Sequence, residues 1–134
     1  MAVLVDSNVL LDIFTEDPRW VGWSAAALER VTQRSTVVIN PVIYAEISVR
    51  FSRIEDLEEA LPRDMLQREP IPYEAAFLAA KVHLGYRRRG GVRNAPLSDF
   101  FIGAHAAVAG HSLLTRDPSR FETYYPSIKL IAPR

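Results

Sequence analysis

Short apolar runs along the chain predict the strands of a sheet. Residues 2–5 (AVLV) and 36–39 (TVVI) are brief, mostly β-branched and followed by polar residues, which is typical of buried strands. Residues 112–115 and 128–131 form two more such runs near the C-terminus. Between these runs, apolar residues recur at the three- and four-residue spacing of amphipathic helices. The pattern therefore predicts strands that alternate with helices.

Cap residues followed by proline mark where two of the helices begin. The pairs at 17–18 (DP) and 40–41 (NP) each combine an N-cap residue with a proline that suits the first helical position. We expect a helix after residue 18, and a second helix from residue 41 to about Ser52. Further helices are expected at 54–61, 73–88 and 97–109, with Gly110 near the end of the last.

This alternation predicts a single α/β domain that covers residues 1–134. The expected architecture is a central, mainly parallel sheet of four to five strands flanked by helices, because strands separated by helices pair in parallel. In such sheets ligands bind outside the carboxyl ends of the strands. Side chains that follow the strands are therefore the first candidates for chemistry.

The composition of the chain excludes several classes of protein. The chain contains no cysteine, which rules out disulfides and thiolate metal sites. Asp6 interrupts the first apolar run, so the N-terminus does not look like a signal peptide, and the apolar stretch at 100–114 is too short to span a membrane. We expect a cytoplasmic protein without membrane contact. The formal net charge is zero, so evidence for a polyanionic partner has to be local.

Four of the acidic residues lie against apolar segments. Asp6 ends the first strand, Glu46 lies within an apolar helix, Asp99 opens another helix, and Asp117 follows a strand by one residue. Each has an ordinary explanation as well. Asp6 and Asp117 suit helix caps, Asp99 complements a helix dipole, and Glu46 is spaced to pair with Arg50.

Taken together, the four acids fit a carboxylate cluster at one edge of a parallel sheet. Clustered carboxylates repel one another and retain protons unless a cation neutralises them. All-oxygen ligands favour Mg²⁺ or Mn²⁺. Such an ion lowers the pKa of a bound water and stabilises charge in phosphoryl displacement.

The sequence resembles the PIN-domain ribonucleases, and among them the VapC-type toxins of toxin–antitoxin modules. The resemblance rests on "VDSNVLLDIF" (5–14), "NPVIYAEIS" (40–48), "YRRRGG" (86–91), "PLSDFFIGAHA" (96–106), "LLTRD" (113–117) and "IKLIAP" (128–133). It implies that Asp6, Glu46, Asp99 and Asp117 form a catalytic metal site for Mg²⁺ or Mn²⁺. It also implies supporting roles for Asn8 and Thr115, a VapB-like antitoxin as partner, and a homodimer.

A basic segment leads into the helix that carries Asp99. Between residues 75 and 98 no acid occurs. We expect the segment to hold an RNA backbone near the metal site, whereas the alternative is a solvated helix end whose arginines favour the dipole. The candidate RNA-binding residues are Arg87, Arg88, Arg89, Arg93 and, beside Asp117, Arg116.

Asp12 and the histidines are assigned outside the site. Asp12 is rotated about 240° from Asp6 on a short helix and is expected to be structural or to face a partner. His83, His105 and His111 lack the spacing of a zinc motif and are expected to be structural or on the surface.

The resulting hypothesis is a metal-dependent endoribonuclease that hydrolyses RNA phosphodiester bonds. Three alternatives stay open at this stage: a non-catalytic RNA- or partner-binding module, an aspartyl phosphatase and a DNA nuclease. The phosphatase typically requires a second aspartate at position 8, where this chain has Asn8.

Overall fold

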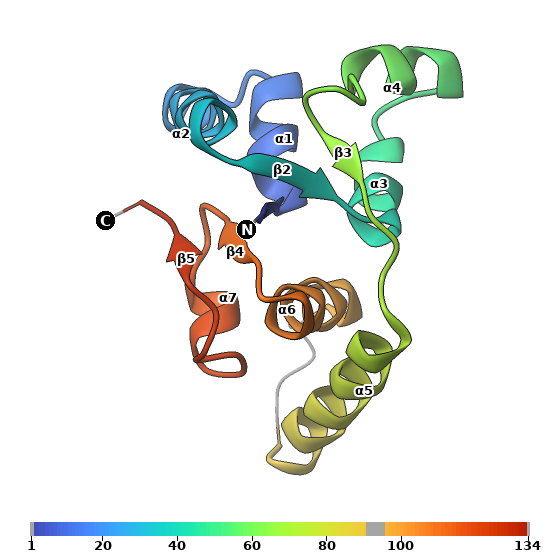
Figure 1. Cartoon of the computed structure of the whole chain (residues 1–134), viewed down its shortest axis with the longest axis vertical. Coiled ribbons are helices and arrows are strands. Elements are labelled where there is room, and N and C mark those ends of the chain that lie inside the picture. The colour runs from blue at the N-terminus through green and yellow to red at the C-terminus, as the bar shows by residue number, and fades with distance from the viewer. Residues whose placement is uncertain (1, 91–95, 134) are drawn as a thin grey trace.

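The sheet lies at the centre of the molecule (Figure 1). The structure, a computed structural model, describes residues 2–90 and 96–133. Within these residues five strands form one sheet in the order β3-β2-β1-β4-β5, and every neighbouring pair is parallel. The α/β class and the parallel sheet are thus confirmed. The strands are β1 (Ala2–Val5), β2 (Thr36–Ile39), β3 (Gln67–Arg68), β4 (Ser112–Leu114) and β5 (Leu130–Ile131).

Helices flank the sheet. Helix α1 contacts α2 and α3, while α6 contacts α3, α5 and α7. Within the described ranges no helix is long and apolar enough to cross a membrane. The helices are α1 (Ser7–Phe14), α2 (Val21–Arg34), α3 (Pro41–Ser48), α4 (Ile54–Ala60), α5 (Tyr73–Arg88), α6 (Leu97–Ala109) and α7 (Ser119–Glu122).

Two helix predictions differ from the structure at their ends. Asp17 does not cap α2; its carboxylate accepts hydrogen bonds from the backbone N–H groups of Arg19 and Trp20, both at 2.9 Å, and so fixes a turn before the helix. The prediction for α3 was right at its start, since the Asn40 side chain accepts from Ile43 N at 2.9 Å. The helix ends at Ser48, short of the expected residue 52.

The edge strands were the least predictable part of the sheet. Strand β3 is polar and only two residues long, and pairing with β2 defines it, since Val38 lies opposite Gln67 and Ile39 opposite Arg68. Strand β5 is shorter than the predicted 128–131, because Ile128 N donates to Tyr125 O in a turn rather than to the sheet.

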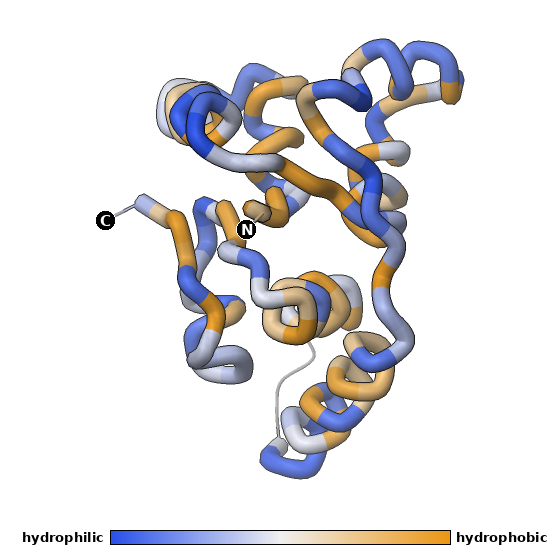
Figure 2. Tube along the Cα trace, in the orientation of Figure 1, coloured by the Kyte–Doolittle hydropathy of each residue, from blue (hydrophilic) through white to orange (hydrophobic). Residues whose placement is uncertain are grey.

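The central strands end where the site begins. Strand β1 pairs with β2 on one side and β4 on the other, and Val3 to Val5 are buried. Figure 2 shows the hydrophobic trace that β1 and β2 contribute at the centre. Beyond the last strand residues, Asp6 N still donates to Leu114 O at 2.8 Å, which brings Asp6 beside the end of β4.

Helix α6 is held close to the chain after α7 by a glycine. A Cβ atom on Gly103 would lie 2.4 Å from ring atoms of Tyr125, a distance that side chains do not tolerate. The Tyr125 hydroxyl donates to Phe100 O at 2.8 Å. Gly110 then ends α6 in the left-handed region with φ of 73°. This packing fixes the N-terminal turn of α6, which carries Asp99.

Candidate metal centre

Asp6 is a buried carboxylate at the carboxyl end of β1. It occupies the N-cap position of α1, but its side chain makes no capping hydrogen bond, so capping does not explain it. Instead Asp6 accepts a hydrogen bond from the Thr115 hydroxyl at 2.8 Å. Only 2% of Asp6 is exposed. An acid in this position is costly to ionise without a cation nearby.

Glu46 faces the site from α3, held by two serines. The Ser7 hydroxyl donates to one carboxylate oxygen at 2.6 Å, and the Ser98 hydroxyl donates to the other at 2.8 Å. Ser7 lies next to Asp6, and Ser98 lies next to Asp99. Among the described residues Glu46 therefore has these hydroxyls as partners, and the alternative pairing with Arg50 does not occur.

Asp99 and Asp117 meet at an arginine that the sequence did not single out. Arg120 Nη1 donates to Asp99 Oδ2 at 3.2 Å, and Arg120 Nε lies 3.0 Å from Asp117 Oδ2. Asp117 Oδ1 also accepts from the Ser119 hydroxyl at 3.0 Å. Asp99 is 6% exposed, whereas Asp117 is partly exposed.

The electrostatics show that the four acids act on one another. Burial raises the pKa of Asp99 to about 7, the Arg120 charge lowers it, and the charges of the other three acids raise it further. Burial likewise raises the pKa of Asp6 to about 6, against the hydrogen bond from Thr115, and Glu46 adds to the rise. The structure thus brings the four predicted acids into one electrostatic cluster.

Asn8 and Thr115 connect the two strand ends around Asp6. Asn8 Nδ2 donates to Thr115 Oγ1 at 3.3 Å, and Thr115 Oγ1 also accepts from Asp117 N at 3.0 Å. With its hydroxyl proton committed to Asp6, Thr115 orients Asp6 and the backbone of Asp117 together. Asn8 is therefore an amide within this network, placed where the phosphatase alternative would need an acid.

Asp12 belongs to a separate buried network. It is 3% exposed and accepts hydrogen bonds from Ser24 Oγ and Arg116 Nε, both at 2.8 Å. The Arg116 guanidinium also lies 5.4 Å from the ring centroid of Trp20. Arg116, one of the RNA-binding candidates, thus forms a salt bridge with Asp12. This pair connects the segment after β4 to α1.

Replacing Arg116 with methionine is expected to lower the free energy of unfolding by about 1–3 kcal/mol. The change leaves Asp12 buried with Ser24 as its remaining partner, and an undersatisfied buried acceptor costs about this much. Urea unfolding measures the change, and Mn²⁺ affinity should stay near the wild-type value. Unchanged stability together with weakened RNA binding would instead support a phosphate contact for Arg116.

The other basic candidates lie at the end of α5. Arg87, Arg88 and Arg89 are exposed there, where they also complement the C-terminal end of the helix dipole. Arg93 lies outside the described residues.

A second polar cluster joins β3 to α6. Glu69 Oε1 lies 2.8 Å from His105 Nε2 and 2.7 Å from His111 Nε2. Within the described part of the chain, these three residues form the one group whose ligand atoms all lie within 4.8 Å of one another. The contact between Glu69 and the two histidines was not predicted, because residues 69, 105 and 111 follow no metal-binding spacing in the sequence.

The proton positions in this cluster disfavour a metal ion. Asn40 Oδ1 accepts from Ile43 N, so the amide is oriented and Asn40 Nδ2 donates to His105 Nδ1 at 3.0 Å. His105 then carries its proton on Nε2 and donates it to Glu69. Burial lowers the pKa of His105, which keeps the ring neutral. A ligating histidine needs the reverse, with Nδ1–H donating outward and Nε2 free.

Changing Asn40 to aspartate is expected to create a Zn²⁺ site that the wild-type protein lacks. One carboxylate oxygen keeps the cap on Ile43 N, and the other accepts a proton from His105 Nδ1, which frees Nε2 toward Glu69 and His111. Calorimetric Zn²⁺ titration measures the gain, and adding His111→Gln should remove it. Tight Zn²⁺ binding by the wild type that His111→Gln abolishes would contradict this assignment of protons.

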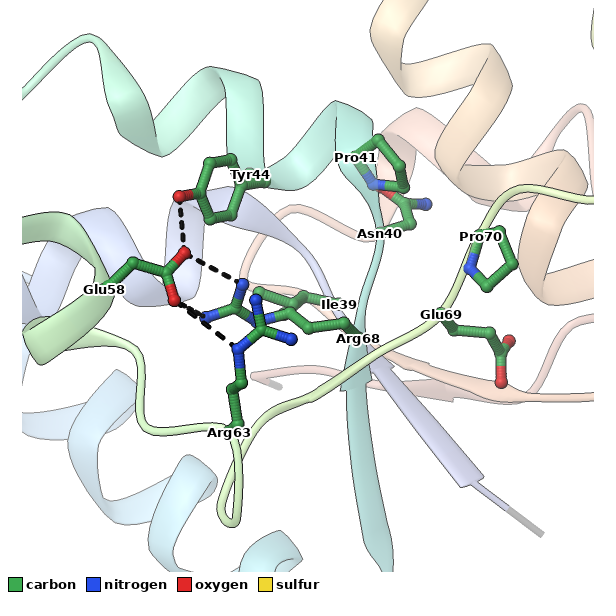
Figure 3. A pocket seen from close by; sticks show the side chains of 9 residues that line it. All are labelled: Ile39, Asn40, Pro41, Tyr44, Glu58, Arg63, Arg68, Glu69 and Pro70. Carbon is green, nitrogen blue, oxygen red and sulfur yellow. Dashed lines mark hydrogen bonds and ion pairs between the residues drawn. The ribbon is translucent and has the colours of Figure 1, made fainter. Parts of the chain in front are cut away.

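A cavity of about 420 Å³ lies away from the four acids (Figure 3). At one end Glu58 accepts from the Tyr44 hydroxyl at 2.6 Å and from Arg68 Nη1 at 3.1 Å, while Glu69 lies at the other end. The hydrogen bond from Tyr44, followed by the hydrogen bond and charge of Arg68, lowers the pKa of Glu58 to about 2. The Glu58 carboxylate in the cavity wall is therefore already paired with Tyr44 and Arg68.

Among the described residues, the cluster formed by Asp6, Glu46, Asp99 and Asp117 suits a hard divalent cation. Its donors are all oxygens, and it includes two buried acids, Asp6 and Asp99, whose pKa values are raised by burial first and then by the charges of neighbouring acids. Asp6, Glu46, Asp99 and Asp117 are the residues that would hold such an ion.

Comparison with known proteins shows which solved structures and which family the chain is similar to. No curated protein matches it significantly. Among solved structures it is similar to VapBC2 from Rickettsia felis bound to a DNA fragment from their promoter, with 16% identity over 100% of both chains and a TM-score of 0.76. It is also similar to VapBC-1 from nontypeable Haemophilus influenzae (18% identity, 98% of both chains, TM-score 0.73) and to a toxin–antitoxin complex from Klebsiella pneumoniae (19%, 98% of both, 0.70). The PIN domain model matches residues 3–125, and the chain therefore belongs to the PIN domain family.

Proposed function

We propose that the protein is a divalent-metal-dependent endoribonuclease that uses Mg²⁺ or Mn²⁺. One observation supports the proposal: Asp6 and Asp99 are both buried, the charges of Asp6, Glu46 and Asp117 all act on Asp99, and the pKa values of Asp6 and Asp99 rise to about 6 and 7. Ionising such carboxylates is unfavourable without a positive charge nearby. A divalent cation would therefore stabilise their charged forms more than a monovalent one. Membership in the PIN family supports nuclease chemistry at this site.

The residues divide the work between binding and orientation. When bound, a divalent cation lowers the pKa of a coordinated water and stabilises charge on phosphoryl oxygens. Asp6 and Asp99 provide the buried ligands, and Thr115 fixes the orientation of Asp6. Ser7 and Ser98 leave Glu46 in one orientation, so that its carboxylate contributes fixed negative charge at the rim. Arg87, Arg88 and Arg89 would hold the RNA backbone.

Cleavage assays on labelled oligonucleotides test the proposal. Single-stranded RNA is expected to be cut in Mg²⁺ or Mn²⁺, and EDTA is expected to stop cleavage. Single-stranded DNA of the same sequence serves as the parallel substrate. Cleavage that survives EDTA would overturn the metal site, and cleavage of DNA alone would overturn the RNA substrate. Tight RNA binding without cleavage in any divalent ion would instead favour a binding module.

We further propose a toxin role with a VapB-like antitoxin as partner, in the cytoplasm. The support is the similarity in fold to proteins whose structures are described as VapBC and toxin–antitoxin complexes. Growth arrest on expression, relieved by the product of a neighbouring small gene, is the expected result. Growth arrest by an Asp6→Asn variant at equal expression would separate any toxicity from the proposed chemistry.

A homodimer is part of the same proposal. Helix α5 exposes Tyr73 and Phe77, one turn apart, to 92% and 66%. Sedimentation equilibrium is expected to give twice the mass of the chain, and a monomer at high micromolar concentration would contradict it.

A further inference from the structure

Among the described residues, Arg120 is the cation whose side chain contacts two acids of the carboxylate cluster. Its guanidinium bridges Asp99 Oδ2 at 3.2 Å and Asp117 Oδ2 at 3.0 Å. Its charge lowers the pKa of both Asp99 and Asp6. One side chain thus partly neutralises acids that come from three separate elements of the fold.

We propose that Arg120 is a built-in counter-ion that competes with the divalent metal for Asp99 and Asp117. It thereby sets the metal concentration at which the site fills. The proposal rests on the proposed metal site, and it concerns what holds that site before a metal arrives. A guanidinium and a divalent cation repel each other at short range, so the same oxygens cannot serve both without a cost.

The spacing of the acids supports competition. In the described residues, the trio of ligand atoms gathered within 4.8 Å is that of Glu69, His105 and His111, and no three of the clustered acids are gathered so closely. Two of the acids instead direct an oxygen to Arg120. Metal binding therefore requires Asp99 and Asp117 to turn away from the guanidinium.

The Arg120 side chain can leave the acids without a change in the backbone of α7. Its side chain is 45% exposed, so the guanidinium has solvent to move into. The next residue, Phe121, is fully buried and anchors the single turn of α7. Exchange of the arginine for a metal is thus a movement of the Arg120, Asp99 and Asp117 side chains over a fixed backbone.

Calorimetric titration with Mn²⁺, without RNA, tests the proposal. Arg120→Gln is expected to bind Mn²⁺ about tenfold more tightly or better, since a repelling charge is removed while a polar side chain of similar length stays. Arg120→Lys, which keeps the charge but loses the two-pronged contact, is expected to fall between that variant and the wild type. Arg34→Gln removes one charge from the exposed end of α2 and should change the affinity by less than about twofold.

Weaker or unchanged Mn²⁺ binding by Arg120→Gln, with the fold intact by circular dichroism, would overturn the proposal, because a merely structural arginine predicts that result. A second readout follows from the first: the Mn²⁺ concentration for half-maximal thermal stabilisation should fall by the same factor. Failure of the nuclease proposal looks different. In that case RNA is not cleaved, while the order of Mn²⁺ affinities still decides the role of Arg120.

Discussion

Asp99→Asn is expected to abolish metal-dependent RNA cleavage, by about 100-fold or more, while leaving the protein at least as stable as the wild type. The amide removes the negative charge that a divalent ion requires. It still offers an oxygen to Arg120, which now donates to Asp99 at 3.2 Å. Because burial raises the pKa of Asp99 to about 7, stability is lost as the pH rises from about 4 through 7, and the neutral amide avoids this cost.

Cleavage rates at saturating Mn²⁺ and urea unfolding at pH 8 measure the two halves of this prediction. Asp64→Asn is the matched control, since it removes an exposed acid in a turn before β3 and should change neither quantity. Cleavage by Asp99→Asn at the wild-type rate would remove Asp99 from the catalytic group. A severe loss of stability would mean that the charge of Asp99 is needed by the fold itself.

The second large effect is a dependence of stability on pH that the metal reverses. The pKa values of Asp6 and Asp99 in the folded protein, about 6 and 7, lie above the value of 3.8 for an unperturbed aspartate. Between these values the folded state binds more protons than the unfolded state. The free energy of unfolding therefore falls as the pH rises from about 4 to above 7, by about 1.4 kcal/mol for each unit of pKa shift.

Comparing the wild type with Asp99→Asn isolates this effect from other titrating groups, such as His105, whose pKa burial lowers. The variant should gain stability relative to the wild type as the pH rises from 5 to 8. Mn²⁺ should stabilise the wild type much more at pH 8 than at pH 5, because protons compete for the same oxygens. Equal stabilisation by Mn²⁺ at both pH values would contradict the carboxylate site.

Much of the fold could be predicted because its signals are local. The runs that became β1 and β2 are buried β-branched segments, and Asn40-Pro41 caps α3 as its residue types indicate. Strand β3 could not be predicted, since Gln67 and Arg68 have no strand pattern and become a strand through pairing with β2. The prediction that Asp17 caps a helix was wrong, because the residue types that cap helices also fix turns.

The site also contains residues that could be predicted from the sequence and residues that could not. The positions of Asp6 and Asp117 follow from the rule that the ends of parallel strands share one edge, and Thr115, which donates to Asp6 and accepts from Asp117 N, links the two across the ends of β1 and β4. Arg120 gave no signal, because its role depends on one turn of helix that points it back at Asp99. The cluster of Glu69, His105 and His111 likewise arises from the register of β3 and the end of α6, which single positions in a sequence do not report.

The location of a bound Mn²⁺ ion tests the central claim most directly. Crystals grown at pH 8 and soaked in Mn²⁺ can be measured for anomalous scattering from the metal. The carboxylate site predicts a peak bounded by Asp6 and Asp99, with the Arg120 guanidinium displaced from its present contacts. A peak confined to Glu69, His105 and His111, or none near the four acids in crystals of protein that cleaves RNA, would contradict the account.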